Sequence, residues 1–154
     1  MSLPPKQAAE KHYKKSLRKA LKLLGNGITY SDQLAEVCST LFGHQFIGVF
    51  ASDLVPRKMK RGSMAIVNLD DSTKPGSHWV ALAKYNSSNT MLVYDSFGRK
   101  TKRILNGLLG GRSEQILDTE YDAEQSVDEM NCGARCVAFL MVFKDLGPRF
   151  AKYI

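Results

Sequence analysis

The chain has 154 residues, of which 44% are hydrophobic, and its formal net charge is +7. This length suits a single domain with one core and is too short for two ordinary domains, so we expect one unit over residues 1–154. The start of the chain is polar and no run of eighteen apolar residues occurs, so we expect neither a signal peptide nor a membrane span, and a soluble, intracellular monomer.

Two helices are predicted in the first part of the chain, over residues 16–43. Leucines recur at helical spacing over 16–24, and Gly25 and Gly27 then end that helix. Ser31 is an N-cap candidate for a second helix, whose apolar stripe runs over 34–41 and ends at Gly43.

A sheet is predicted over residues 46–121, from short apolar runs at 46–50, 64–69, 78–85, 90–97 and 115–121 that are separated by turn-rich segments. The last predicted element is a helix over 132–146, which is apolar nearly all round and therefore buried; Gly147-Pro148 ends it. This order of elements predicts an α+β domain in which a central mixed β-sheet packs on the last helix.

The run from His78 to Phe97 predicts a hairpin whose register can be worked out. If Tyr85 pairs with Thr90, paired residues sum to 175, and Val80 lies opposite Asp95. His78 is then a diagonal neighbour of Asp95 on the same face, within side-chain reach. We expect the carboxylate to fix the tautomer of the imidazole and leave its second nitrogen to act as a base.

Cys132 opens the last helix, between Asn131 and Gly133. The positive end of the helix dipole and a nearby imidazolium would lower the pKa of its thiol, which gives a nucleophilic thiolate. Gln125 offers an amide donor that, with the backbone N–H of Cys132, would bind an oxyanion. Each of these residues taken alone is more often structural than catalytic.

The other two cysteines are expected to be core residues. An odd number of cysteines cannot all pair, and positions 38, 132 and 136 do not resemble a secreted disulfide framework, so free thiols in a reducing compartment are the simpler interpretation. Cys132 and Cys136 lie four residues apart on a helix, but no second ligand pair at zinc-type spacing accompanies them, so we expect no metal site.

The combined motifs resemble those of the adenovirus endopeptidase (adenain) family of cysteine proteases. The residues that carry the resemblance are His78-Trp79, Tyr94-Asp95-Ser96-Phe97-Gly98, and Gln125 with a six-residue gap before Cys132-Gly133. Chain order and spacing agree over roughly residues 46 to 145. The family has Glu at the position of Asp95. The related SUMO proteases have Asp there, as this chain does. The resemblance implies a papain-like fold and a site in which Cys132, His78, Asp95 and Gln125 are catalytic.

The resemblance also implies an endopeptidase that processes viral precursor proteins during virion maturation, in the virion and the host nucleus. The chemistry then needs no cofactor, although activation by DNA or a short peptide stays an open expectation. Trp79, Gly133 and Asn131 are expected near the substrate and the oxyanion, with an ordinary core role for the indole of Trp79 as the alternative.

Basic clusters are the part of the sequence that would bind DNA or another polyanion. One lies at residues 14–19, and the two others consist of Arg57, Lys58, Lys60, Arg61, Arg99, Lys100, Lys102 and Arg103. Charge alone provides no groove or stacking platform, so solvated surface or nuclear-import signals remain the alternative.

Two other functions stay open at this point. One is an isopeptidase that acts on the Gly-Gly tails of ubiquitin-like proteins, as a deSUMOylase or deubiquitinase does. The other is a catalytically dormant module that associates with DNA or the capsid on the same fold.

Overall fold

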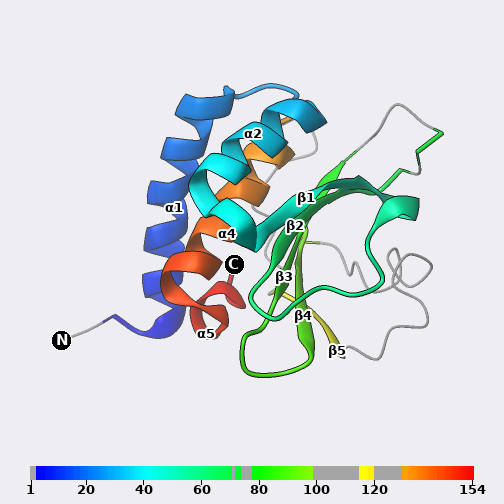
Figure 1. The fold of residues 1–154 in the computed structure, drawn as a ribbon. Helices are drawn as coiled ribbons and strands as arrows, with labels where there is room; N and C mark the ends of the chain where they lie inside the picture. Colours follow the sequence, from blue (N-terminus) through cyan, green and yellow to red (C-terminus); the bar gives the residue numbers. More distant parts are fainter. Residues whose placement is uncertain (1–2, 71, 74–77, 99–114, 120–129) are drawn as a thin grey trace.

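A computed structural model describes residues 3–70, 72–73, 78–98, 115–119 and 130–154. Two helices come first, then the strands of one sheet, then two more helices (Figure 1). In chain order the elements are α1 (Pro5–Leu24), α2 (Ser31–Phe42), the short 3₁₀ helices η1 (Gly43–Gln45) and η2 (Ser52–Leu54) on either side of β1 (Phe46–Ala51), β2 (Met64–Asn68), β3 (Trp79–Lys84), β4 (Thr90–Tyr94), β5 (Gln115–Asp118), α4 (Cys132–Leu146) and α5 (Pro148–Ala151).

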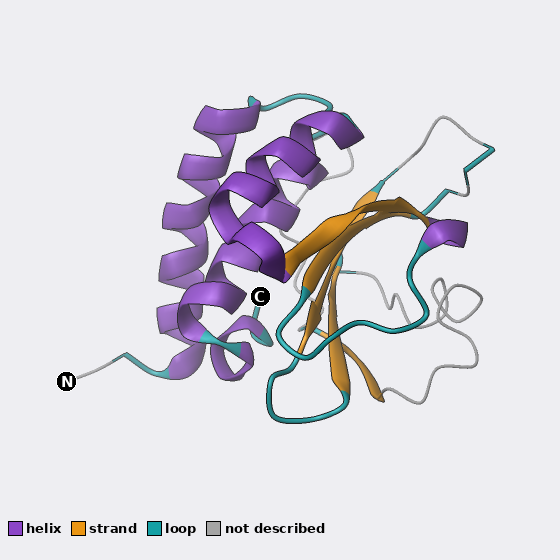
Figure 2. Ribbon diagram, viewed as in Figure 1, coloured by secondary structure: helices purple, strands orange, loops and turns teal. Residues whose placement is uncertain are grey.

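The α-helices form one layer and the strands the other, as Figure 2 shows by colour. The five strands follow their sequence order in the sheet, β1-β2-β3-β4-β5. The β1–β2 and β4–β5 pairs are parallel, whereas β2–β3 and β3–β4 are antiparallel. The predicted α+β class with a mixed sheet is therefore confirmed, while the extent of a single domain over residues 1–154 stays a prediction.

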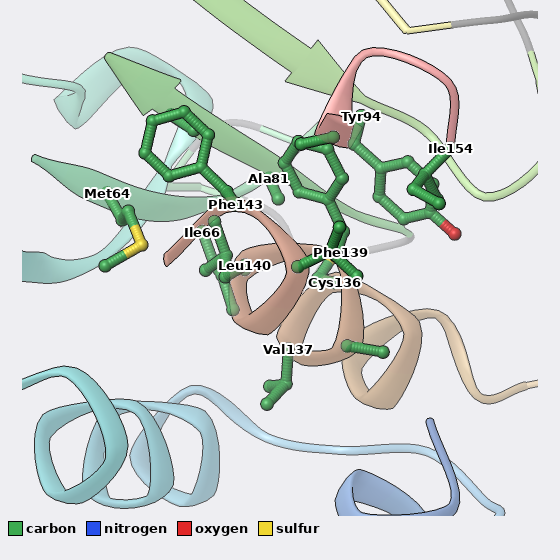
Figure 3. Close-up of a cluster of buried hydrophobic side chains, with 14 of the residues drawn as sticks. Met64, Ile66, Ala81, Tyr94, Cys136, Val137, Phe139, Leu140, Phe143 and Ile154 are labelled. Carbon is green, nitrogen blue, oxygen red and sulfur yellow. The ribbon is translucent and has the colours of Figure 1, made fainter. Parts of the chain in front are cut away.

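The main core lies between α4 and the sheet. Figure 3 shows Phe139, Leu140 and Phe143 of α4 directed toward the strands, whereas Val137 points away from them. The ring of Phe139 stacks on that of Tyr94, with centroids 4.8 Å apart and planes 3° from parallel. α4 also packs along α1, so it is covered on two sides. This explains why its sequence is apolar nearly all round.

A second core covers the opposite face of the sheet. Alternate residues of the three central strands, among them Ala65, Val67 and Val80, pack there with Met59. The strands β2 and β4 are consequently buried at every position. Strands buried on both faces read as continuous apolar runs instead of alternating patterns, which is what the sequence has.

The predicted start of the first helix, at residue 16, is wrong. α1 begins at Pro5. Proline suits the first position of a helix, because the N–H that it lacks would have no acceptor within the helix. Its buried face consists of Ala9, Tyr13, Ser16 and Ala20, which are spaced four, three and four residues apart. Small and polar residues make up most of this face, so a search for leucines misses it.

Other boundaries differ by less. Ser31 is the first residue of α2 and not its N-cap; the backbone N–H of Tyr30 is bound by the side chain of Gln33, at 2.9 Å. The predicted end of the last helix at Gly147-Pro148 is confirmed, and α5 then begins at Pro148, an element that the sequence analysis did not predict.

Candidate active site

The β3–β4 hairpin brings His78 and Asp95 together. Ala81 pairs with Tyr94 and Leu82 with Val93, so paired residues sum to 175 and the predicted register is confirmed. His78 directly precedes β3 and Asp95 directly follows β4. The His78 Nε2 and Asp95 Oδ1 atoms lie 2.7 Å apart, and both side chains are buried. The expected contact between imidazole and carboxylate is therefore present.

The turn after Asp95 supports the imidazole from a second side. Asp95 Oδ1 also accepts a hydrogen bond from the Phe97 N–H, at 2.9 Å, and the Asp95 carbonyl accepts one from the Gly98 N–H, at 2.8 Å. Gly98 has φ 69°, a conformation that favours glycine. The turn stacks the Phe97 ring on the His78 ring, with centroids 4.5 Å apart. The Asp-Ser-Phe-Gly motif is thus one unit that holds the imidazole by its edge and its face.

Cys132 is the first residue of α4, and its thiol lies close enough to His78 for each group to shift the pKa of the other. Because Nε2 of the imidazole contacts Asp95, Nδ1 is the ring nitrogen left to interact with the thiol. The backbone N–H groups of Trp79 and Gly133 are also directed to the sulfur. Cys132 is partly exposed, whereas His78 and Asp95 are buried, so the thiol is the member of the group that solvent reaches.

These contacts favour a thiolate beside an imidazolium. Burial acts to raise the pKa of Cys132, but the hydrogen bond and charge of His78 and the two backbone N–H groups together lower it below the ordinary thiol value. Burial acts to lower the pKa of His78, but the hydrogen bonds and charges of Asp95 and Cys132 together raise it. Both shifts widen the pH range in which the ion pair exists.

The two remaining cysteines are chemically different from Cys132. Both are fully buried, as expected of core residues. Burial raises the pKa of Cys38 to about 12 and that of Cys136 well above its ordinary value, where the charges of Cys132 and Asp95 add to the effect. Neither thiol therefore carries an activated sulfur.

The three residues expected near the substrate and the oxyanion, Asn131, Trp79 and Gly133, contact the segment that joins α1 and α2. Asn131 is buried and its side chain bonds Asn26, with Nδ2 to Oδ1 at 2.9 Å. The half-buried indole of Trp79 packs against the main core and donates from Nε1 to the Thr29 carbonyl, at 3.1 Å. Gly133 faces the Thr29 side chain so closely that a Cβ there would overlap its Oγ1 atom.

Several predicted residues cannot be placed in this geometry. Gln125 lies outside the described residues, as do Arg99, Lys100, Lys102 and Arg103. The cluster of Arg57, Lys58, Lys60 and Arg61 lies exposed between η2 and β2. Within the described part of the chain, no group of three His, Cys, Asp or Glu side chains is arranged to hold a metal ion. No helix in that part is long and apolar enough to span a membrane.

Comparison with known proteins gives two matches, both to viral proteases. A sequence model described as adenovirus endoprotease matches residues 46–108, a range that includes His78 and Asp95. A protease from Bovine adenovirus B serotype 3 is 34% identical in an alignment 117 positions long, which covers 66% of this chain and 57% of that protein. The chain thus spans less than two thirds of the relative's length.

By these matches the chain is similar to viral proteases. The resemblance to the adenovirus endoprotease family that its motifs predict is confirmed over residues 46–108, and membership of that family stays a proposal.

The sequence analysis missed four residues that contact the site or its neighbours. Phe97 belongs to the motif that carries the resemblance, and its spacing of two from Asp95 is a usable signal for a shared face. Asn26, Thr29 and Tyr13 carry no such signal, because they reach the site only through tertiary contacts over 50 or more positions in sequence.

Proposed function

We propose that this protein is a cysteine endopeptidase in which Cys132 is the nucleophile, His78 the general acid and base, and Asp95 the group that orients the imidazole. The observation that carries the proposal is the position of Cys132, the first residue of a buried helix, beside the hydrogen-bonded pair of His78 and Asp95. A thiol, an imidazole and a carboxylate in this order perform acyl transfer in proteases on unrelated folds.

The proposed reaction starts from the Cys132 thiolate and the His78 imidazolium. The sulfur attacks the carbonyl carbon of a peptide bond, and the carbonyl oxygen becomes an oxyanion. Collapse of this intermediate breaks the C–N bond, while His78 gives its proton to the leaving amine. Water, deprotonated by the neutral His78, then attacks the thioester and releases the acid, which returns the thiol. Asp95 stays ionised throughout and stabilises the imidazolium.

The oxyanion would be bound by the backbone N–H of Cys132 and the side-chain amide of Gln125. The N–H of the first residue of a helix has no acceptor within the helix, so it can donate to a ligand. All the reacting groups belong to the chain, so the chemistry as proposed requires no cofactor.

The natural substrates that we propose are viral precursor proteins cleaved during virion maturation, on the strength of the kinship with adenovirus proteases. The exposed cluster at residues 57–61 supports the further proposal that the protein binds DNA in the host nucleus and virion, because four cations in five residues attract phosphates. A salt-dependent loss of DNA binding in a variant with Arg57, Lys58, Lys60 and Arg61 changed to Gln is the expected result.

The test of the chemistry is alkylation of the purified protein with iodoacetamide across pH 5 to 10, with adducts located by mass spectrometry. Because the pKa of Cys132 is lowered, Cys132 should react at lower pH than an ordinary thiol. His78→Ala and Asp95→Asn should move the pH profile of Cys132 alkylation to higher pH. The first variant removes the imidazolium, and the second removes the carboxylate charge that stabilises it. Asp95→Asn should lower the rate at pH 6.5 about tenfold.

Activity is measured in parallel on peptides with small residues at the scissile bond and on SUMO- and ubiquitin-derived substrates, with and without DNA. Cys132→Ala should abolish cleavage, and Cys136→Ala, matched in chemistry but buried, should not. Preference for the ubiquitin-like substrates would support the isopeptidase instead. If Cys132 reacts no faster than ordinary thiols in the presence and absence of DNA, the protease proposal is wrong.

A further inference from the structure

Each of the three proposed catalytic residues has a sequence neighbour that is bound by the N-terminal part of the chain. Trp79 follows His78, Tyr94 precedes Asp95, and Asn131 precedes Cys132. Residues 25–30 are called the α1–α2 segment. The side chains of all three neighbours make direct hydrogen bonds to α1 or to this segment. The N-terminal part of the chain therefore contacts a residue adjacent in sequence to each of the three proposed catalytic residues.

The contact at Asn131 is fixed in both directions. Its Oδ1 accepts from Arg135 Nε at 3.0 Å, and its Nδ2 donates to Asn26 Oδ1 at 2.9 Å. A guanidinium can only donate, so Asn131 must turn its oxygen to Arg135 and its amino group to Asn26. The residue directly before the nucleophile is thus held between the first turn of α4 and the α1–α2 segment.

The same Arg135 leads to α1 and then to β4. Its Nη1 donates to Tyr13 Oη, at 3.3 Å, and Tyr13 Oη lies 2.8 Å from Tyr94 Oη. Both tyrosines are buried, 3% and 0% exposed, so this pair of hydroxyls is shielded from water. Polar groups in such surroundings interact more strongly than on the surface. Tyr13 therefore links the start of α4 to Tyr94, the last residue of β4, which directly precedes Asp95.

Thr29 makes the third contact. Its carbonyl accepts the indole N–H of Trp79, whose own backbone N–H is directed to the Cys132 sulfur. Its side chain packs on Gly133, the residue after the nucleophile. The Thr29 hydroxyl makes no hydrogen bond within the described part of the chain although it is buried. Its role at this site is one of packing.

We propose that α1 and the α1–α2 segment set the geometry of the catalytic group, with Asn26, Thr29 and Tyr13 as positioning residues. They act through their hydrogen bonds to Asn131, Trp79 and Tyr94. Their effect is on the distance and alignment of sulfur, imidazole and carboxylate, which lie at the ends of three different elements, α4, β3 and β4. Displacements of about 1 Å are enough to cost such a site most of its rate.

α1 is suited to this function because it is anchored elsewhere. Its buried face packs along α4. Directly before Tyr13, His12 Nε2 contacts Asp145 Oδ2 near the far end of α4, at 2.8 Å. Loss of a single contact at residue 13 or 26 therefore removes a restraint on the site without detaching the helix. This inference rests on the proposed function of Cys132, His78 and Asp95.

The test compares the wild type with Asn26→Ala, which deletes the contact with Asn131, and Tyr13→Phe, which deletes the contacts with Arg135 and Tyr94; both leave the backbone and core rings in place. Asn86→Ala is the matched control, because Asn86 is exposed in the turn at the opposite end of the β3–β4 hairpin from His78 and Asp95. The measurements are the pH profile of iodoacetamide alkylation at Cys132 and thermal unfolding of each variant.

Asn26→Ala and Tyr13→Phe should each lower alkylation at pH 6.5 by at least about fivefold and move the profile to higher pH, while the proteins stay folded and Asn86→Ala behaves as wild type. If Cys132 of the wild type is alkylated at low pH and the two variants show the same pH profile, the positioning role is overturned and the proposed chemistry stays intact. A wild type without any low-pH reactivity would overturn both. A merely structural role would change the unfolding temperature and not the pH profile.

Discussion

At the scale of single residues, two buried threonines differ in what their hydroxyls contact. Thr29 is 3% exposed, and its Oγ1 has no hydrogen-bond partner among the described residues. Thr90 is 6% exposed, and its Oγ1 accepts from Ser88 Oγ at 2.9 Å. A buried polar group without a partner costs stability, whereas a satisfied one contributes modestly.

Replacement of each threonine by valine should therefore have opposite effects. Thr29→Val should keep or increase the free energy of unfolding, by up to about 1 kcal/mol, because it removes an unsatisfied hydroxyl at nearly constant volume. Thr90→Val should decrease it by about 1 kcal/mol, because Ser88 loses its acceptor. Urea denaturation measures both. An equal loss in the two variants would mean that the Thr29 hydroxyl has a partner in solution.

The contact between His78 and Asp95 is the part of the site that the sequence could predict. It depends only on an even loop length and the two-residue period of a strand, and both are local properties. Asn26 and Thr29 could not be found in this way. They reach Asn131 and Trp79 because α1 and α2 fold against α4, and that docking depends on the fit of many side chains.

At the scale of elements, the start of α4 depends on the absence of a side chain at Gly133. A Cβ there would overlap Thr29 Oγ1 and lie 3.1 Å from Thr29 Cβ and 3.3 Å from Leu34 Cδ2. These atoms belong to the α1–α2 segment and to α2, so the first turn of α4 is pressed against both. The glycine that follows the nucleophile is consequently required by the close packing of these elements.

Gly133→Ala should decrease the free energy of unfolding by about 1–3 kcal/mol, the usual cost of overpacking, and should also slow alkylation of Cys132. Addition of Thr29→Ala removes the overlapping oxygen, so the double variant should recover part of both losses. Gly27→Ala is the control: nothing lies within 4 Å of a Cβ at that position, and its effect should stay within about 0.5 kcal/mol. A double variant no better than Gly133→Ala would contradict this account.

Helix prediction succeeded where the apolar pattern was strong and failed where it was not. α4 was predicted to within one residue because nearly all its positions are apolar. α1 was predicted without its first eleven residues, because alanines, a tyrosine and a serine form its buried face. Small residues let α1 approach α4 closely, and they carry little hydrophobic signal of their own.

At the scale of the whole molecule, the two fully buried thiols, Cys38 and Cys136, should make the stability of the fold depend on alkaline pH. Both belong to the main core, Cys38 on α2 and Cys136 on α4. Burial raises the pKa of Cys38 to about 12, above the value of about 8.5 for a thiol in an unfolded chain. The neutral thiol therefore stabilises the fold fully below about pH 8.5, and this contribution is lost as the pH rises toward the folded-state pKa.

Cys38→Ala isolates this contribution. Between pH 8 and pH 10 the unfolded wild type gains a thiolate that the folded state cannot form, which lowers the free energy of unfolding by about 2 kcal/mol more in the wild type than in the variant. The cavity left by the substitution acts equally at both pH values, so it cancels in the comparison. Urea denaturation at the two pH values under reducing conditions gives the four free energies. An identical pH dependence in the two proteins would mean that Cys38 ionises inside the folded protein, and that water reaches the layer between the helices and the sheet.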